Sequence, residues 1–204
     1  MKVTFYLMGL LIASAAMVQA QQAKTILFFG DSITAGYGLE EEQAFPAFIQ
    51  KKLDENGHRY LAVNAGLSGE TSAGGLRRID WVLQQRVDIF VLELGGNDGL
   101  RGIDPRSTKE NLQGIMDRVK AKYPDADIIL TGMEAPPNMG GNYTGEFRNI
   151  FSDLAQANDV VFMPFILEGV AGDPELNLPD GIHPTEEGHR IIAENLWVVI
   201  KDVL

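Results

Sequence analysis

Short apolar runs alternate with longer amphipathic segments along this chain, and no other feature of the sequence restricts its fold as strongly. The five runs are Thr25–Phe29, Tyr60–Val63, Ile89–Leu94, Asp127–Leu130 and Val160–Met163. The segments that we expect to be helical are Ala44–Asn56, Ser72–Gln85, Ser107–Lys122, Thr144–Ala157 and a last helix after Pro184. Such alternation predicts a parallel sheet with helices on both faces. With right-handed crossovers, it predicts an α/β protein that forms a three-layer α/β/α sandwich on a five-stranded parallel sheet.

Residues 1–20 have the features of a secretory signal peptide. Lys2 gives a positive start, the stretch from Val3 to Met17 is almost wholly apolar or small, and Ala20 offers a small residue at the expected cleavage point. The stretch is short for a membrane span, which needs about 20 apolar residues; retention as an anchor is the alternative. Residues 21–204 are enough for one domain with a full core and too few for two.

Composition excludes several classes of function. The net charge of −11 disfavours nucleic acid and anionic membrane surfaces as partners, and loss of the signal peptide would make it more negative. The absence of cysteine excludes disulfides, thiol catalysis and thiolate metal sites. An exported chain without disulfides fits a bacterial periplasm or the medium. We expect a monomer that needs no cofactor or metal and whose mature chain is not stably inserted in a membrane.

Gly30-Asp31-Ser32 follows the first apolar run, and this position suits a nucleophile. The carboxyl ends of parallel strands share one rim of the sheet, where ligands of open α/β folds bind. A serine hydroxyl is a weak nucleophile until a neighbouring base removes its proton. The sequence must therefore deliver a base to the same rim.

Of the three histidines, His183 is the best candidate for this base. It lies in the loop after the last apolar run, and Asp180, three residues earlier, can orient its ring. A local turn or a metal-ligand pair is the other interpretation of Asp-x-x-His. His58 precedes the second run and so belongs to the opposite rim, while His189 falls inside the last helix, where a surface or packing role is expected.

Acyl transfer also needs hydrogen-bond donors for the oxyanion. Asn97, in Gly95-Gly96-Asn97-Asp98 after the third run, offers a side-chain amide. Gly66, after the second run, offers a backbone amide without an obstructing side chain. Each fragment alone could be an ordinary turn, but their order, each after its own strand, favours a single site.

Three other enzyme classes fit poorly. The Gly-x-Ser-x-Gly turn of α/β-hydrolases is absent, because Ile33 and Thr34 follow Ser32. His183 and His189 are poorly spaced as a metal-ligand pair. No Gly-x-Gly-x-x-Gly follows the first run, which argues against a dinucleotide enzyme.

Taken in order, these fragments resemble the SGNH (GDSL-type) hydrolase family, whose fold is flavodoxin-like. The family's four invariant residue types match Ser32, Gly66, Asn97 and His183, and Asp180 matches the acid of its Asp-x-x-His motif. The resemblance runs from Lys24 to the last helix, so that 21–204 would be one SGNH hydrolase domain.

Three blocks are most similar to the bacterial periplasmic subgroup of multifunctional acyl-CoA thioesterases, lysophospholipases and arylesterases. They are Gly30–Gly38, Glu93–Gly102 and Asp180–Pro184. Ile33 stands where the family name implies leucine, a swap that keeps an apolar side chain.

The resemblance implies a mechanism through an acyl-enzyme. Ser32 would attack the acyl carbonyl and His183, held by Asp180, would take its proton. The oxyanion would lie between the amides of Ser32 and Gly66 and the side chain of Asn97. Asp31 and Asp98 would hydrogen-bond loop backbone rather than react. The loop Gly99–Pro105, with Gly99, Leu100, Ile103 and Pro105, would contact the acyl chain.

Three functions remain open at this point. The first is a serine esterase that hydrolyses esters and thioesters of acyl chains. A carbohydrate acetylesterase of the same family is the second, and a non-catalytic acyl-binding module is the third. Apolar residues near the expected rim favour an acyl chain, and they are Leu39, Phe45, Leu100, Ile103, Met133, Met139, Phe165 and Ile166.

Overall fold

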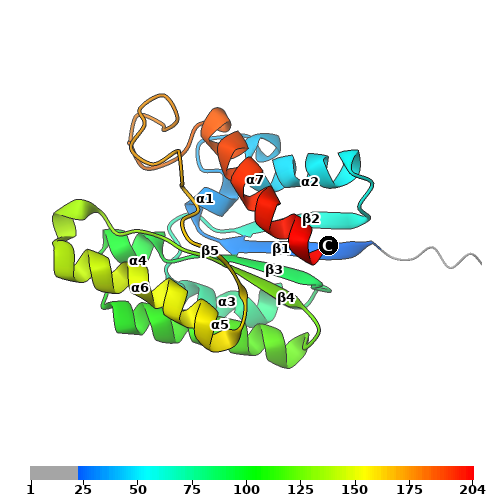
Figure 1. The fold of residues 1–204 in the computed structure, drawn as a ribbon, viewed down its shortest axis with the longest axis horizontal. Coiled ribbons are helices and arrows are strands. Elements are labelled where there is room, and N and C mark those ends of the chain that lie inside the picture. Colours follow the sequence, from blue (N-terminus) through cyan, green and yellow to red (C-terminus); the bar gives the residue numbers. More distant parts are fainter. Residues whose placement is uncertain (1–22) are drawn as a thin grey trace, which may run out of the picture.

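The computed structural model describes residues 23–204, and the expected signal peptide, residues 1–20, lies outside them. Figure 1 shows one sheet between two layers of helices. No helix among the described residues is both long and apolar enough to span a bilayer.

The sheet has five parallel strands in the order β2-β1-β3-β4-β5. Their bounds are β1 Lys24–Gly30, β2 Tyr60–Gly66, β3 Ile89–Glu93, β4 Asp127–Thr131 and β5 Val161–Met163. The α/β sandwich expected from the sequence is thus confirmed. The strand order reverses between β1 and β3, and open α/β sheets bind their ligands at such a point.

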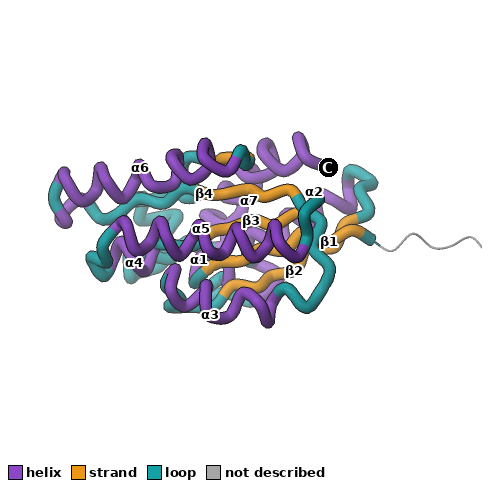
Figure 2. Tube along the Cα trace, turned by 90° about the horizontal axis from the view of Figure 1, so that it is seen from below, coloured by secondary structure: helices purple, strands orange, loops and turns teal. Residues whose placement is uncertain are grey.

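Seven α-helices are found among the described residues. Their bounds are α1 Ser32–Ala35, α2 Phe45–Glu55, α3 Ser72–Val82, α4 Gly96–Leu100, α5 Pro105–Lys122, α6 Gly141–Asn158 and α7 Glu186–Ile200. Short 3₁₀ turns occupy Glu41–Gln43, Pro137–Met139 and Lys201–Val203. Helices α2 and α7 cover one face, while α3, α5 and α6 cover the other (Figures 1 and 2).

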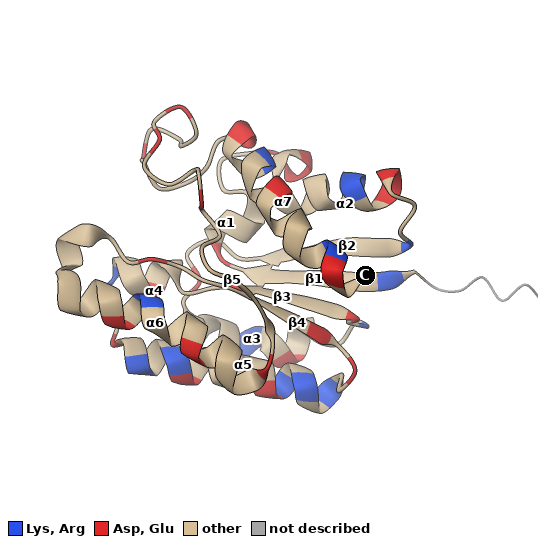
Figure 3. Cartoon of the chain, viewed as in Figure 1, with Lys and Arg blue, Asp and Glu red and all other residues tan. Residues whose placement is uncertain are grey.

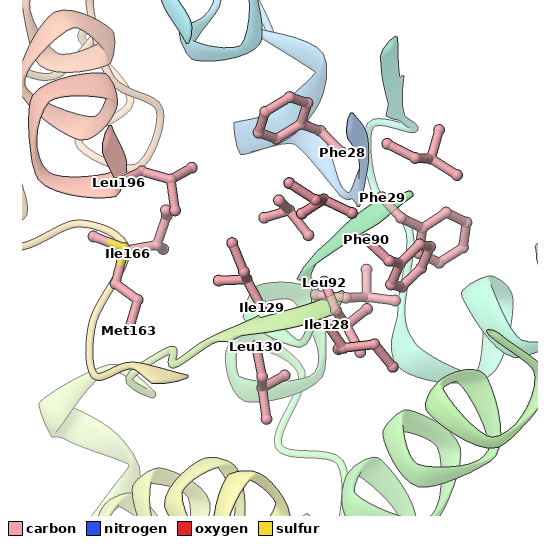
Figure 4. Packing of buried hydrophobic residues seen from close by; sticks show 14 of the residues in the cluster. Phe28, Phe29, Phe90, Leu92, Ile128, Ile129, Leu130, Met163, Ile166 and Leu196 are labelled. Carbon is pink, nitrogen blue, oxygen red and sulfur yellow. The ribbon is translucent and has the colours of Figure 1, made fainter. Parts of the chain in front are cut away.

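The central strands are buried on both faces, as in other parallel sheets. Phe28 and Phe29 point to opposite sides of β1 (Figure 4). Phe28 packs edge-on against Phe45 of α2, whereas Phe29 lies under the guanidinium of Arg78 in α3. Because β1 is anchored in both layers, the residues that follow it start from a rigid platform.

The expected helices are present, with shifted ends. α3 stops at Val82 instead of Gln85, since the chain must turn into β3. α5 begins at Pro105 because the Asp104 side chain accepts from Arg106 N and caps the helix. The short helices α1 and α4 have no counterpart in the sequence-based prediction, and both lie at the rim where the site was expected.

Candidate active site

Ser32 is the first residue of α1, directly after the carboxyl end of β1. Asp31 precedes it as the N-cap, its Oδ1 accepting from Ile33 N at 3.0 Å. No protein acceptor is assigned to the Ser32 N–H within the described part of the chain, as is usual in a helix's first turn. Ser32 thus presents a hydroxyl and a free N–H at the reversal point of the sheet.

The structure brings Ser32, His183 and Asp180 together. Nε2 of His183 lies 3.0 Å from Ser32 Oγ, and Nδ1 lies 2.7 Å from Asp180 Oδ2. Both distances are within the range of a hydrogen bond. This chain of contacts has the geometry of a nucleophile, a base and an acid that orients the base.

The carboxylate of Asp180 is held by its own loop. Its Oδ1 accepts from the backbone N–H groups of Ile182 at 2.9 Å and His183 at 3.0 Å. The hydrogen bond from the His183 ring and these backbone bonds lower the pKa of Asp180 to about 2. The acid is therefore ionised at neutral pH and fixed relative to the base.

Two contacts place the imidazole of His183. The carbonyl of His183 accepts from Leu178 N at 2.7 Å, which closes the loop around Gly181. Gly181 has a φ of +69°, a backbone region that favours glycine. The Tyr37 ring lies 4.4 Å from the imidazole, centroid to centroid, at an interplanar angle of 37°. Tyr37 was not identified from the sequence, although it lies in the Gly30–Gly38 block.

The other two histidines lie away from Ser32. His58, before β2, contacts the ring of Trp197. His189 is buried in α7, and its Nδ1 accepts from Phe45 N at 3.2 Å. Desolvation by burial lowers the pKa of His189 to about 4. His189 thus has the packing role expected from the sequence, as a neutral acceptor that joins α7 to α2.

Asn97 lies in α4, and Asp31 holds its amide. Asn97 Nδ2 donates to Asp31 Oδ2 at 3.2 Å, which leaves the second N–H of the amide available. Asp31 is 2% exposed, and its burial raises its pKa to about 6. Asp31 is therefore mostly ionised above about pH 6. It bonds a side chain as well as backbone, whereas the sequence suggested only backbone.

Gly66 does not present the free amide that the sequence suggested. Its N–H donates to Asn64 Oδ1 at 2.9 Å. A Cβ at Gly66 would lie 2.2 Å from Ala35 N, so the glycine allows β2 to pack against α1. The prediction that Gly66 donates to an oxyanion is thus at odds with the geometry, because this N–H is already bonded.

Gly69, three residues further on, has the properties expected of Gly66. It has a φ of +80°, and no partner is assigned to its N–H within residues 23–204. Its carbonyl accepts from Arg101 Nη2 at 3.1 Å, and the same nitrogen lies 3.5 Å from Asn97 Oδ1. Arg101 thus links the Gly69 loop to the Asn97 helix. The sequence contained both glycines but no local signal to choose between them.

Asp98 has a structural environment. Its carboxylate accepts from Ser72 N at 2.8 Å, from Ser72 Oγ at 2.6 Å and from Thr108 Oγ1 at 3.2 Å. These bonds fasten α4 to the starts of α3 and α5. Asp98 therefore bonds backbone, as expected, and two hydroxyl groups in addition.

The segment Gly99–Pro105 is only partly a loop, contrary to the sequence-based expectation. Gly99 and Leu100 belong to α4, and Pro105 is the buried first residue of α5. Gly99 is closely packed, since a Cβ there would lie 3.2 Å from the Phe147 ring. Ile103 is partly exposed, and its carbonyl accepts from the Tyr143 hydroxyl at 2.8 Å. Of the four residues named from the sequence, only Leu100 and Ile103 are therefore accessible to a ligand.

The apolar residues near the rim also differ from the expected set. Phe45, Met133 and Ile166 belong to the core. Leu100, from the expected set, is about half exposed, and so are Tyr37, Leu67 and Ile182, which were not in that set. Each follows a different strand, so the rim that carries the triad also carries exposed apolar side chains.

Comparison with known proteins identifies the family. Residues 28–191 match the GDSL-like lipase/acylhydrolase family. The chain belongs to this family. Esterase TesA of Pseudomonas aeruginosa is 38% identical over 95% of the chain and 96% of its own length. Thioesterase 1/protease 1/lysophospholipase L1 of Escherichia coli K12 is 39% identical over 86% of the chain and 83% of its own length.

The fold of a solved relative supports the same family assignment. A crystal structure of TesA superposes with a TM-score of 0.85 at 39% identity and covers 89% of this chain and all of that one. The arylesterase of Vibrio mimicus is 34% identical over 92% of the chain and 94% of its own length. The chain is therefore an ester-hydrolysing enzyme of this family.

Proposed function

We propose that the chain hydrolyses carboxylic esters and thioesters of acyl chains through an acyl-enzyme on Ser32. The observation that carries this proposal is the continuous contact from Ser32 Oγ through His183 to Asp180, at 3.0 and 2.7 Å. His183 Nε2 takes the serine proton as Ser32 attacks the carbonyl carbon. The same proton then goes to the leaving alcohol or thiol. A water molecule, deprotonated by His183, releases the acid and restores the serine.

Three donors would stabilise the oxyanion in this proposal. They are the backbone N–H groups of Ser32 and Gly69 and the amide side chain of Asn97. The free amide and left-handed backbone of Gly69 support its choice over Gly66, whose N–H is bonded to Asn64. Donors that are fixed before the reaction stabilise the developing charge without reorganisation. The amide of Asn97 is held at both atoms, because its Nδ2 donates to Asp31 and its Oδ1 accepts from Arg101.

The choice of Gly69 can be tested through Arg101. R101M should lower kcat several-fold with little change in KM, because the Gly69 loop loses its tie to α4. R106M is a matched control, since the Arg106 side chain bonds Asp104, away from Gly69 and Asn97. An R101M enzyme as active as R106M would argue against this tie.

The apolar surface around the triad favours an acyl or aryl substrate. Tyr37, Leu67, Leu100 and Ile182 offer contacts to hydrocarbon, which gains about 25 cal/mol per Å² on burial. A carbohydrate acetylesterase would need aromatic platforms for a sugar. Tyr37, the exposed aromatic of the rim, already stacks on His183. The names of the relatives, which include an arylesterase, a thioesterase and a lysophospholipase, fit the same choice.

Charge also bears on the substrate. The segment 164–184, which carries the base, has four acids and no lysine or arginine. In Figure 3 this loop shows red and no blue, whereas α5 carries several basic residues. Such a field disfavours substrates with anionic groups next to His183. Neutral esters should therefore turn over better than acyl-CoA thioesters, which carry phosphates.

The proposal includes a location and a single-domain organisation. We propose that residues 1–20 direct the chain to the periplasm or the medium, where 21–204 acts as a monomer without a cofactor. The apolar stretch from Val3 to Met17 and the small Ala20 support this. Fractionation of cells expressing the full chain, with N-terminal sequencing of the mature enzyme, tests it.

Hydrolysis of p-nitrophenyl esters from acetate to decanoate tests the activity. We expect turnover that persists through the longer chains, and loss of at least 10³-fold in S32A. Turnover of acetate alone would favour the acetylesterase, and no turnover of any ester would contradict the proposal. Mass spectrometry after treatment with diethyl p-nitrophenyl phosphate should find one adduct, on Ser32.

A further inference from the structure

Glu93 is a buried carboxyl group that the mechanism above does not use. It is the last residue of β3 and is 1% exposed. Its backbone pairs in register with Gly30, the residue at the end of β1. The side chain of Glu93 therefore lies against the turn that carries Ser32.

One oxygen of Glu93 accepts three hydrogen bonds from this turn. Oε2 accepts from the backbone N–H groups of Asp31 and Thr34, both at 3.3 Å, and from Thr34 Oγ1 at 2.7 Å. The two backbone donors stand on either side of Ser32 in the sequence. A single side chain thus fixes the backbone just before and just after the nucleophile.

The other oxygen of Glu93 has no partner. Oε1 is buried and, within residues 23–204, makes no hydrogen bond. No lysine, arginine or histidine in that part of the chain forms an ion pair with Glu93. A buried carboxylate without a cation is unfavourable. A carboxylic acid at the same place avoids the buried charge, and its Oε2 can still accept the three hydrogen bonds.

We propose that Glu93 is a positioning residue, which holds the turn of Ser32 as a neutral carboxylic acid. The inference rests on the proposed role of Ser32. Through the turn, Glu93 fixes both Ser32 Oγ and the Ser32 N–H. Because β3 continues directly toward Asn97, the same side chain also sets the distance between two of the proposed oxyanion donors.

A neutral Glu93 avoids placing a second negative charge beside Asp31. Asp31 is charged above about pH 6, and it lies next to Glu93. A second negative charge would repel both Asp31 and the oxyanion that forms on the substrate. Burial raises the pKa of Glu93 well above its usual range, and the charge on Asp31 raises it further. The three hydrogen bonds to Oε2 act in the opposite direction, but burial outweighs them.

Other charged groups act on the turn that Glu93 holds. Asp98 of α4 and His183 act on its neighbour Asp31. Arg78 of α3 donates to the carbonyl of Gly30 at 3.3 Å. Because several groups titrate together here, the charge state of Glu93 has to be read from a comparison with a variant that cannot ionise.

Activity measurements with E93Q, E93L and T131V test the positioning role. E93Q keeps an acceptor oxygen without a charge, whereas E93L removes the acceptor. We expect E93Q to stay within about threefold of wild-type kcat and E93L to lose roughly ten- to hundredfold, with KM unchanged. Phosphylation of Ser32 by diethyl p-nitrophenyl phosphate should slow in parallel. T131V removes a buried side-chain hydroxyl from the same end of the sheet but not from the Ser32 turn, and its kcat should remain near wild type.

Two outcomes of this comparison would overturn the proposal. Equal losses in E93Q and E93L would mean that the negative charge is needed. Wild-type kcat in E93L would mean that the three hydrogen bonds do not position the nucleophile. If E93L does not fold, the kcat of E93Q and the urea unfolding described next still test the proposal.

Urea unfolding of wild type and E93Q at pH 5 and pH 8 tests neutrality without reference to activity. A folded state that retains the Glu93 proton loses stability as pH rises, because the unfolded chain releases that proton above its ordinary pKa. E93Q should therefore gain stability relative to wild type between pH 5 and pH 8. A difference that does not change with pH would contradict a neutral Glu93. Failure of the Ser32 mechanism would instead appear as full activity in S32A.

Discussion

Asp31 holds Asn97: Oδ2 of the residue before the nucleophile accepts from Nδ2 of the proposed oxyanion donor at 3.2 Å. The contact joins the end of β1 to the helix that follows β3, across the reversal point of the sheet. It uses one N–H of the amide and leaves the other available. The nucleophile and the oxyanion donor are thus parts of one hydrogen-bonded unit.

Removing the side chain of Asn97 should reduce turnover. N97A loses one donor of the oxyanion, so we expect kcat to fall roughly 10²–10³-fold with little change in KM. D31N keeps the size of its side chain and should cost less, since Asn97 remains present but loses a charged acceptor. An N97A enzyme with more than about half of wild-type kcat would show that this residue is only part of a turn.

The choice of base can be tested by comparing the three histidines. H183A removes the base and should cost on the order of 10³-fold or more in kcat. H58A and H189Q should stay within a few-fold, because His58 contacts Trp197 and His189 accepts from Phe45 N. A comparable loss in H189Q with the fold intact, checked by circular dichroism, would contradict the assignment of His183.

Substrate length should matter at Leu100 and Ile103. Each buried methylene contributes up to about 0.8 kcal/mol, near fourfold in binding. L100S and I103S should therefore leave acetate turnover nearly unchanged and weaken octanoate and decanoate progressively. L61S is the control, since Leu61 is similarly exposed but lies in the edge strand β2, away from the rim. An equal fall at every chain length would show that the residue supports the fold instead.

Stability at acidic pH should depend on His189. Its folded pKa of about 4 is below the unfolded value of 6.5, so the folded state binds fewer protons in this range. Stability from a neutral His189 is complete above about pH 6.5 and is lost as pH falls toward 4, by up to about 3 kcal/mol. H189Q should flatten this decline in thermal unfolding between pH 7 and pH 4.5. Parallel curves for both proteins would indicate that His189 does not titrate on unfolding.

Periodicity and strand order were enough to predict most of the fold. The apolar runs became the five strands because parallel strands are buried on both faces. The sequence also predicts that Ser32, Asn97 and His183 lie at one rim, because the carboxyl ends of parallel strands share it. The ends of the helices were predicted less accurately. For example, Asp104 caps α5 through a side-chain hydrogen bond that residue spacing alone does not identify.

The choice between Gly66 and Gly69 could not be made from the sequence. Gly66 is the last residue of β2 and Gly69 lies in the loop that follows, and they differ in what surrounds them. The side chain of Asn64 accepts a hydrogen bond from the Gly66 N–H, and the backbone of Ala35 leaves no room for a Cβ at Gly66. Glu93, by contrast, had a signal that could have been used: it is an acid inside an otherwise apolar run. A charge-bearing residue in a strand buried on both faces needs a specific reason.

The base and its acid are three residues apart, whereas the base and the nucleophile are 151 residues apart. The Asp180–His183 pair can therefore assemble as soon as its own loop closes, at little entropic cost. Contact with Ser32 requires the C-terminal segment to dock on β1, a long-range event that is slower to form. In a refolding experiment, regained hydrolysis would time this docking step separately from the recovery of helical signal.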